Sequence, residues 1–340
     1  LYILPSFVAP HKLQGSNASG KARAELCRIA FRNVAEAVVD EYEIERGETS
    51  YSYITCAHFR ERFPDAEIYF LMGADMLENF PKWKRPEDIL KNVTLAACGR
   101  ANGDLKEYAK TVETLYGNAP VLVPFTGEDV SSTRIRVELA FGKEPAELDS
   151  AVLEDIKKEG LYTHPAIAPA LALEKEERRE HSFRTALTAV KYAKREGIAE
   201  DRVILACALH DCGKYVPLSS PLLAGFTPPE GVPAPVMHQY TGAYLAEHQF
   251  GIEDKGVLDA IRFHTSGREN MSTLEQLILV ADMVEEGRTF PGVEELRAAL
   301  DRSLREGLVA CLTRQNEFLR EQKQPVYPLT EKALKWALKG

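Results

Sequence analysis

The spacing of apolar residues changes once along the chain, and this change constrains the fold more than any other feature. Apolar runs that read as buried strands occur in the first half, at residues 1–4, 68–72, 94–98 and 121–123. Helical spacing separates them at residues 24–37 and 56–62, and strand–helix alternation is typical of a parallel sheet. Beyond residue 173, apolar residues recur almost only at helical spacing. The sequence predicts an α/β domain followed by an all-α domain.

The length of the chain also favours two domains. A chain of 340 residues exceeds what one hydrophobic core usually organises. Residues 163–172 are rich in Pro and Ala and are the best candidate for a linker. We therefore expect domains at residues 1–162 and 173–340, with a long loop at residues 217–235 in the second.

Charge and cysteine usage limit the partners and the compartment. A net charge of −9 argues against binding to nucleic acid or to an anionic membrane, but small phosphorylated ligands need only a local cluster of cations. The chain has no run of about 18 apolar residues, the length that spans a bilayer. Its six cysteines show no C-x-x-C spacing, so we expect free thiols and a cytoplasmic protein. These features are also compatible with a homo-oligomer.

A series of histidines and aspartates in the second half is typical of a metal site. Imidazole and carboxylate ligands suit iron, manganese or zinc, and a carboxylate can bridge two ions. Two bridged ions can activate water and clamp the oxygens of a phosphoryl group. One His-Asp pair alone is weak evidence, but the ordered pattern H…HD…H…H…D at predicted helix ends predicts a dinuclear site. Its members are His181, His210, Asp211, His238, His264 and Asp282, and Lys214 completes an H-D-x-x-K motif. We expect His248, which lacks such a setting, to be structural.

This half resembles the HD superfamily and, within it, the symmetrical bis(5'-nucleosyl)-tetraphosphatases. The resemblance rests on E-H-S at 180–182, L-H-D-C-G-K at 209–214, H-Q-Y-T-G-A at 238–243, H-T-S-G-R at 264–268 and A-D-M-V-E-E-G-R at 281–288. It implies cleavage of diadenosine tetraphosphate into two ADP at a dinuclear centre, with iron expected first and manganese or zinc as alternatives.

The resemblance also implies the role of each residue in this centre. One metal is held by His181, His210, Asp211 and Asp282, and the other by Asp211, His238 and His264. Asp211 and Lys214 are the expected catalytic residues, and the expected phosphate contacts are Lys214, Arg268 and Arg288.

Two segments of the first half are placed to bind a nucleotide. The strand at residues 67–72 runs into Gly73-Ala74-Asp75, and ligands of open α/β sheets bind beyond the carboxyl ends of strands. Residues 130–136 open a helix with Ser, Thr and two arginines. An N-cap alone explains the hydroxyls, but arginines there oppose the helix dipole and favour an anionic ligand.

The first half resembles nicotinate-nucleotide adenylyltransferases, which have a Rossmann-like fold. The resemblance rests on P-H-K at 10–12, S-Y-S-Y-x-T at 50–55, G-A-D-M at 73–76, W-K-R at 83–85 and S-S-T-x-I-R at 131–136. It implies transfer of the adenylyl group of Mg²⁺-bound ATP to nicotinate mononucleotide, giving deamido-NAD. The implied nucleotide-binding residues are Lys12, Ser52, Thr55, Gly73, Asp75, Trp83, Arg85, Ser132, Thr133 and Arg136, with Thr55 and Trp83 at the nicotinate end.

One motif of that family is not found in the sequence. G-x-F-x-P-x-H-x-G-H, which lies on the family's first strand and helix, occurs nowhere in the chain, and we expect it to precede Leu1. Two hypotheses follow. The first is a bifunctional enzyme, and the second is an active phosphohydrolase joined to a nucleotide-binding or regulatory module.

Overall fold

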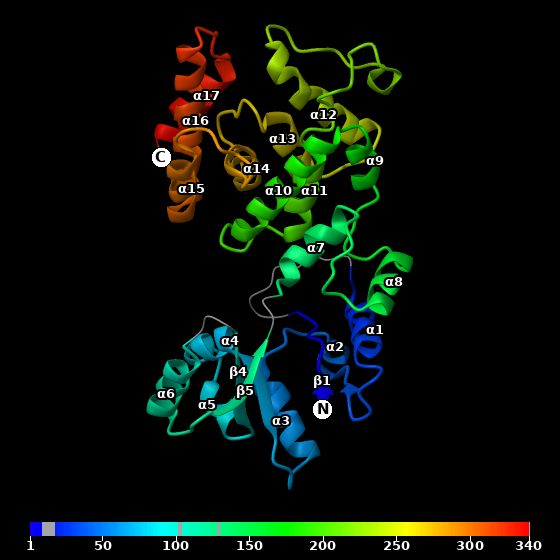
Figure 1. The fold of residues 1–340 in the computed structure, drawn as a ribbon, viewed down its shortest axis with the longest axis vertical. Coiled ribbons are helices and arrows are strands. Elements are labelled where there is room, and N and C mark those ends of the chain that lie inside the picture. The colour runs from blue at the N-terminus through cyan, green and yellow to red at the C-terminus, as the bar shows by residue number, and fades with distance from the viewer. Residues whose placement is uncertain (9–17, 101–103, 128–129, 340) are drawn as a thin grey trace. The chain divides into compact units, whose positions relative to one another are not determined.

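The computed structural model describes residues 1–8, 18–100, 104–127 and 130–339, and these form two compact units (Figure 1). The first unit holds the described residues up to Ser131, and the second begins at Ser132.

The first unit alternates strands and helices. In chain order its elements are β1 (Tyr2–Ile3), α1 (Gly20–Ala30), β2 (Val38–Val39), α2 (Tyr42–Arg46), α3 (Ser52–Arg62), β3 (Tyr69–Gly73), α4 (Ala74–Asn79), η1 (Phe80–Lys82), α5 (Pro86–Leu90), β4 (Thr94–Arg100), α6 (Leu105–Tyr116) and β5 (Val121–Gly127).

Both sheets of this unit are parallel. The larger has the order β3-β4-β5, with Tyr69 opposite Thr94, and the smaller pairs β1 with β2. Helices between the strands bury Leu77, Phe80 and Ile89 completely against β4. The predicted α/β class is confirmed, because the apolar runs form strands and the intervening segments form helices.

One predicted helix is shorter than expected. The helical spacing at residues 24–37 predicted one continuous helix, but α1 starts at Gly20, where the Ser19 side chain caps Ala22, and ends at Ala30. The chain then forms β2, whose Val38 N–H donates to the carbonyl of Leu1. Local spacing could not show this pairing, because it depends on a strand far away in the sequence.

The second unit is entirely helical among its described residues, as predicted. Its elements are α7 (Ser132–Ala140), α8 (Ser150–Lys158), α9 (Ile167–Ala172), α10 (Glu176–Ala193), α11 (Glu200–Leu209), η2 (Pro221–Leu223), η3 (Ala234–Val236), α12 (Met237–His248), α13 (Lys255–Phe263), α14 (Thr273–Val284), α15 (Val293–Arg302), α16 (Leu304–Glu321) and α17 (Pro328–Leu338).

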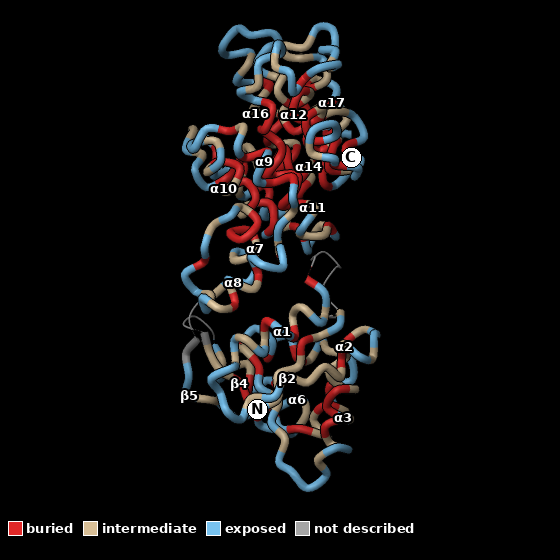
Figure 2. Tube along the Cα trace, turned by 90° about the vertical axis from the view of Figure 1, so that its right-hand side faces the viewer, coloured by how far each residue is buried: buried red, intermediate tan, exposed pale blue. Residues whose placement is uncertain are grey.

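Helix α14 lies at the centre of this unit. Its middle is apolar on all sides, and Leu277, Ile278 and Leu279 are buried in succession, which is typical of an enclosed helix. Ser272 caps its start in a capping box with Glu275. Helices α10, α13 and α16 pack around it, and Figure 2 shows buried residues concentrated along α11 and α14. This packing brings the ends of several helices to one place.

The segment that joins the two halves is more ordered than the sequence indicated. Residues 163–172, which we expected to be a linker, contain α9, whose Ile167, Ala170 and Leu171 enter the helical core. Their spacing of three and four residues gives a short helix one apolar face. Helices α7 and α8, within the expected first domain at residues 1–162, lie in the second compact unit by contact.

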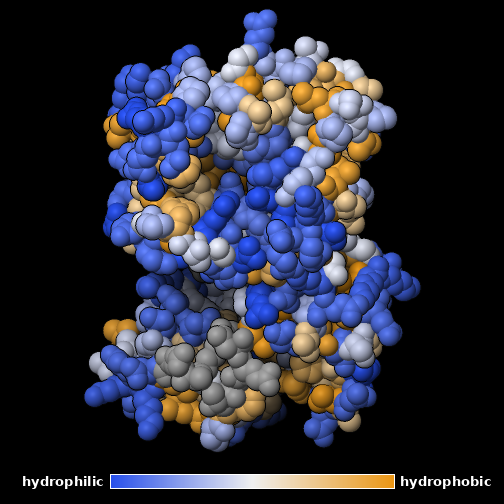
Figure 3. All heavy atoms as spheres, turned by 45° about the horizontal axis from the view of Figure 1, so that its top comes forward, coloured by the Kyte–Doolittle hydropathy of each residue, from blue (hydrophilic) through white to orange (hydrophobic). Residues whose placement is uncertain are grey.

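No helix among the described residues combines the length and the apolar character needed to cross a membrane. The face drawn in Figure 3 is mainly hydrophilic, with hydrophobic residues in separate patches.

Candidate metal centre and nucleotide-binding residues

Five helices of the second unit contribute the predicted metal ligands. His181 lies in the second turn of α10, rather than at its end, and His238 is the second residue of α12. The other ligands stand at carboxyl ends: His210 and Asp211 follow α11, His264 follows α13, and Asp282 lies in the last turn of α14. The structure therefore brings together all six residues that the sequence pattern selected.

The first ligand group joins His181, His210 and Asp282. One potential ligand atom from each residue lies within 4.8 Å of the others. His181 Nε2 is 2.7 Å from Asp282 Oδ1, and His210 Nε2 is 4.0 Å from the same oxygen. The group is almost fully buried, and two nitrogens and one carboxylate can face a single cation.

The second ligand group consists of Asp211, His238 and His264, and it lies around Oδ1 of Asp211. Asp211 Oδ1 is 3.2 Å from His238 Nε2 and 3.7 Å from His264 Nε2. Asp211 Oδ2 faces the first group, at 3.4 Å from His210 Nε2 and 4.0 Å from His181 Nε2. Because its two oxygens face different groups of histidines, Asp211 has the position of a carboxylate that bridges two cations.

The hydrogen bonds of the histidines fit metal binding. His210 Nδ1 lies 2.7 Å from the carbonyl of Cys207, and His264 Nδ1 lies 2.8 Å from that of Ile261. Since a carbonyl only accepts, Nδ1 carries a proton in both rings, and Nε2 is the atom that can bind a cation once it is deprotonated. The buried Nε2 atoms of His181 and His210 lie near carboxylate oxygens but form no hydrogen bond of normal geometry. Unpartnered buried nitrogens are costly, and cations would satisfy them.

The electrostatics of the cage, the six residues described above, oppose the protonation state that metal binding needs at His210 and favour it at His264 and Asp211. Burial alone would lower the pKa of His210, but the charges of Asp211, Asp282 and Glu174 raise this pKa to about 9. Burial and the neighbouring His210 and His238 lower the pKa of His264 to about 4, against the opposing effect of Asp211. Burial would also raise the pKa of Asp211, yet His210 and the other histidines hold it well below its usual range.

Three cationic side chains reach the cage. Lys214 Nζ lies 3.3 Å from Asp211 Oδ1, and Arg288 Nη2 donates to Asp282 Oδ1 at 2.8 Å. Arg178, which the sequence analysis missed, donates from Nη1 to Asp211 Oδ2 at 2.9 Å. Its position three residues before His181, one turn away on the same side of α10, is the signal that could have revealed it.

Arg268, the remaining predicted phosphate contact, is engaged elsewhere. Its guanidinium donates to both oxygens of the buried Glu275, at 2.6 and 2.9 Å, and to Asp259 at 3.1 Å. Glu275 also accepts the backbone N–H of Ser272 in the capping box of α14. Arg268 thus ties the turn after α13 to the start of α14.

Glu285, which was also not predicted from the sequence, forms a hydrogen bond with the ligand histidine His181. Glu285 is 2 % exposed and accepts from His181 Nδ1 at 3.1 Å, from Arg184 Nε at 2.7 Å and from the N–H of Gly287 at 2.6 Å. Burial would raise the pKa of Glu285, but these donors lower it to about 2. Its place three residues after Asp282 was the available signal.

The nucleotide-binding residues that were predicted for the first half of the chain do not share one structural setting. Gly73 ends β3 and directly precedes α4, and a Cβ at this position would lie 2.8 Å from Asp75 Oδ1. Thr55 is buried and donates to Glu43 at 2.7 Å. Trp83 packs against the apolar core of the unit, with its ring edge-on to that of Phe70.

Other residues of that predicted set lie at turns or helix starts. Arg85 has a left-handed backbone conformation, pairs with Asp88 and lies 4.8 Å from the ring of Tyr53. Ser52 and Ser132 begin α3 and α7. Lys12 lies outside the described residues.

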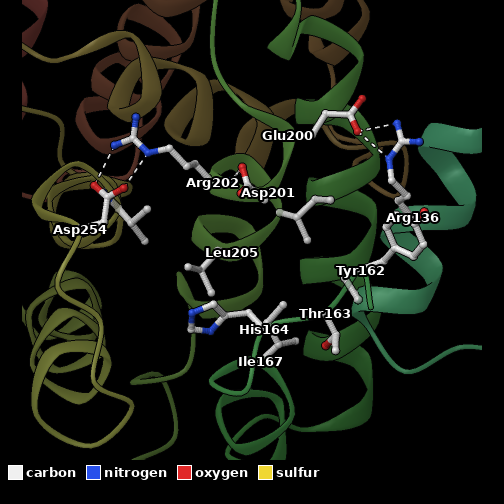
Figure 4. A pocket seen from close by; sticks show the side chains of 13 residues that line it. Arg136, Tyr162, Thr163, His164, Ile167, Glu200, Asp201, Arg202, Leu205 and Asp254 are labelled. Atoms are coloured by element: carbon white, nitrogen blue, oxygen red, sulfur yellow. Dashed lines mark hydrogen bonds and ion pairs between the residues drawn. The ribbon is translucent and has the colours of Figure 1, made fainter. Parts of the chain in front are cut away.

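The two remaining residues, on α7, face a carboxylate. Arg136 donates to Glu200 Oε2 from Nε at 2.9 Å and from Nη2 at 2.6 Å (Figure 4). Thr133 donates to Oε1 of the same carboxylate at 3.1 Å. Arg136 and Glu200 line a pocket of about 260 Å³, which His164 and Leu205 line as well. A carboxylate therefore occupies the donors that the resemblance assigns to ATP.

Comparison with known proteins assigns the two halves of the chain to two different families. Residues 178–287 match the HD domain family, and residues 1–138 match the cytidylyltransferase-like family. The chain is 34% identical over 182 residues to the symmetrical bis(5'-nucleosyl)-tetraphosphatase of Bacillus subtilis, covering 50% of this chain and 97% of that protein.

Two further relatives cover the first half. The "probable nicotinate-nucleotide adenylyltransferase" of Lactococcus lactis is 34% identical over 47% of this chain and 78% of its own length. The "probable nicotinate-nucleotide adenylyltransferase/Ap4A hydrolase" of Mycoplasma pneumoniae is 28% identical, over 84% of this chain and 79% of its own length. The chain belongs to the nicotinate-nucleotide adenylyltransferase family in its first half and to the HD-domain symmetrical bis(5'-nucleosyl)-tetraphosphatase family in its second.

Proposed function

We propose that the second half hydrolyses diadenosine tetraphosphate symmetrically to two ADP at a dinuclear metal centre. The observation that carries the proposal is the convergence of six candidate ligands, together with two buried imidazole nitrogens that form no hydrogen bond. The relatives named for this reaction support the substrate.

In such a site, some residues would hold the two metal ions and others would contact the phosphates. His181, His210, Asp211 and Asp282 would hold one ion, and Asp211, His238 and His264 the other. Bound ions supply Lewis acidity and lower the pKa of water. Lys214, Arg178 and Arg288 offset the charge of the polyphosphate, and each now pairs with a ligand carboxylate that a cation would neutralise.

Iron is the metal that we propose first, with manganese and zinc as alternatives, because all three accept imidazole and carboxylate ligands. Metal analysis of protein purified without added metal tests this choice. An iron content near two per chain supports it, whereas manganese or zinc at that level contradicts it.

The hydrolase is tested by ADP release from diadenosine tetraphosphate and by metal content. Asp211→Ala removes the bridging carboxylate and is expected to abolish both. His248→Ala is the matched control, since His248 stacks on Tyr244 outside both ligand groups and is half exposed. Loss of activity in both variants, or in neither, contradicts the assignment.

We propose, for the first half, adenylyl transfer from Mg²⁺-bound ATP to nicotinate mononucleotide. The reaction needs no protein nucleophile, because the phosphate of the mononucleotide attacks the α-phosphate of ATP and pyrophosphate leaves. The alternative is a nucleotide-binding or regulatory module that does not catalyse transfer. The pairing of Thr133 and Arg136 with Glu200 counts against transfer, because it occupies donors that the resemblance assigns to ATP. Formation of deamido-NAD supports transfer, and ATP binding without product supports the alternative.

A further inference from the structure

Tyr215 follows the cage motif directly and points away from the core. It comes one residue after Lys214, and 42% of its surface is exposed. The next residue, Val216, packs against the helical core instead. The backbone is therefore anchored while the aromatic ring faces solvent beside the cage.

Cationic side chains of the α10 region lie next to the ring. Lys175 Nζ lies 4.7 Å from its centroid, in a cation–π contact. The hydroxyl of Tyr215 also interacts electrostatically with the guanidinium of Arg178. Arg178 in turn donates to Asp211 Oδ2 at 2.9 Å, so Tyr215 neighbours a residue that contacts the metal cage.

A dinucleoside polyphosphate carries a base at each end of its phosphate chain. When the phosphates lie at Lys214, Arg178 and Arg288, a base must lie near the border of the cage. A positioned, exposed aromatic ring offers it a stacking surface without requiring particular hydrogen bonds.

We propose that Tyr215 is a base-stacking residue, which binds one purine ring of the substrate and so determines specificity for nucleotides over inorganic polyphosphates. This inference rests on the proposed hydrolase function and deepens it. Arg178, which neighbours Tyr215 and contacts Asp211, would face the phosphates.

The test compares two substitutions and two ligands on the metal-loaded chain of 340 residues. Tyr215→Phe keeps the ring and removes the hydroxyl, whereas Tyr215→Leu removes the ring. Binding of ADP and of inorganic pyrophosphate is measured by calorimetry, and metal content is measured in each variant. Stacking is worth about 1–3 kcal/mol per base, so Tyr215→Leu is expected to weaken ADP binding by roughly 5- to 150-fold. Pyrophosphate binding and metal content should stay unchanged, and Tyr215→Phe should resemble the wild type.

Other results overturn the inference. An unchanged affinity for ADP in Tyr215→Leu contradicts stacking, and so does equal weakening for ADP and pyrophosphate. A loss in Tyr215→Phe as large as in Tyr215→Leu assigns the effect to the hydroxyl instead. Hydrolysis of diadenosine tetraphosphate by the wild type is measured separately. If it is absent while ADP binding still depends on the ring, the proposed reaction fails and the stacking site stands.

Discussion

Glu285 accepts a hydrogen bond from Nδ1 of His181, so that Nε2 of the same ring faces the candidate metal site. Arg184 and the backbone N–H of Gly287 hold the carboxylate in place. Carboxylates behind metal-binding histidines orient the ring and increase its basicity, and their loss typically lowers metal affinity about 10- to 100-fold.

Glu285→Gln is therefore expected to weaken metal binding by about 10- to 100-fold while His181 itself is retained. Competition with a chelator of known affinity measures the change, and circular dichroism verifies the fold. Glu286→Gln, next in sequence and exposed, is the control. Equal metal affinity in the Glu285 variant and the wild type would remove the supporting role.

Metal affinity is expected to rise with pH up to about 9, the pKa of His210 in the metal-free protein. His210 must lose its proton to bind a cation, so affinity should increase by up to about tenfold per pH unit below that value. The sign for stability is opposite. The folded-state pKa is raised above the usual 6.5, so the stabilisation of metal-free protein is complete below pH 6.5 and disappears as pH rises through 9. Chelator competition and thermal unfolding across pH 6–10 check both, and a flat affinity would contradict the prediction.

Arg178 and Arg268 are expected to respond differently to substitution. Arg178→Gln should impair hydrolysis of diadenosine tetraphosphate, because it removes a cation at the cage. Arg268→Gln should instead cost about 1.5–3 kcal/mol of stability, because it leaves the buried Glu275 without its charged partner. Steady-state kinetics and denaturant unfolding of both variants separate the effects. Unchanged stability with a raised KM in Arg268→Gln would restore the role that the family resemblance gives this arginine.

Glu200→Gln is expected to strengthen ATP binding, because it weakens the pairing with Arg136 and Thr133. Partly exposed ion pairs are worth about 0.2–1 kcal/mol, so the gain should reach at most about fivefold. Asp254→Asn is the control, because it weakens a similar pair with Arg202 in the same pocket without touching α7. A titration with a fluorescent ATP analogue measures both. Equal affinities in the two variants would show that Glu200 does not compete with nucleotide.

The sequence alone was sufficient for the class of each half and for selecting the six His and Asp residues that the fold brings together. Strand-length apolar runs predicted β3, β4 and β5, and helical spacing predicted the core helices of the second half. These six residues could be selected because metal-binding chemistry is carried by residue type, and because their order along the chain is that of a known pattern.

Only the tertiary structure decided which charges meet. Glu285 reaches His181 from 104 residues away, Arg136 reaches Glu200 from 64, and Arg268 pairs with Glu275 instead of facing the cage. Local spacing specifies which face of a helix a side chain occupies, because that follows from backbone geometry. It does not specify the helix that lies opposite, because this depends on how all the apolar faces pack together. Hence the candidate ligands could be selected from the sequence, whereas the residues that support them, the pairing of α7 and the surroundings of Tyr215 could not.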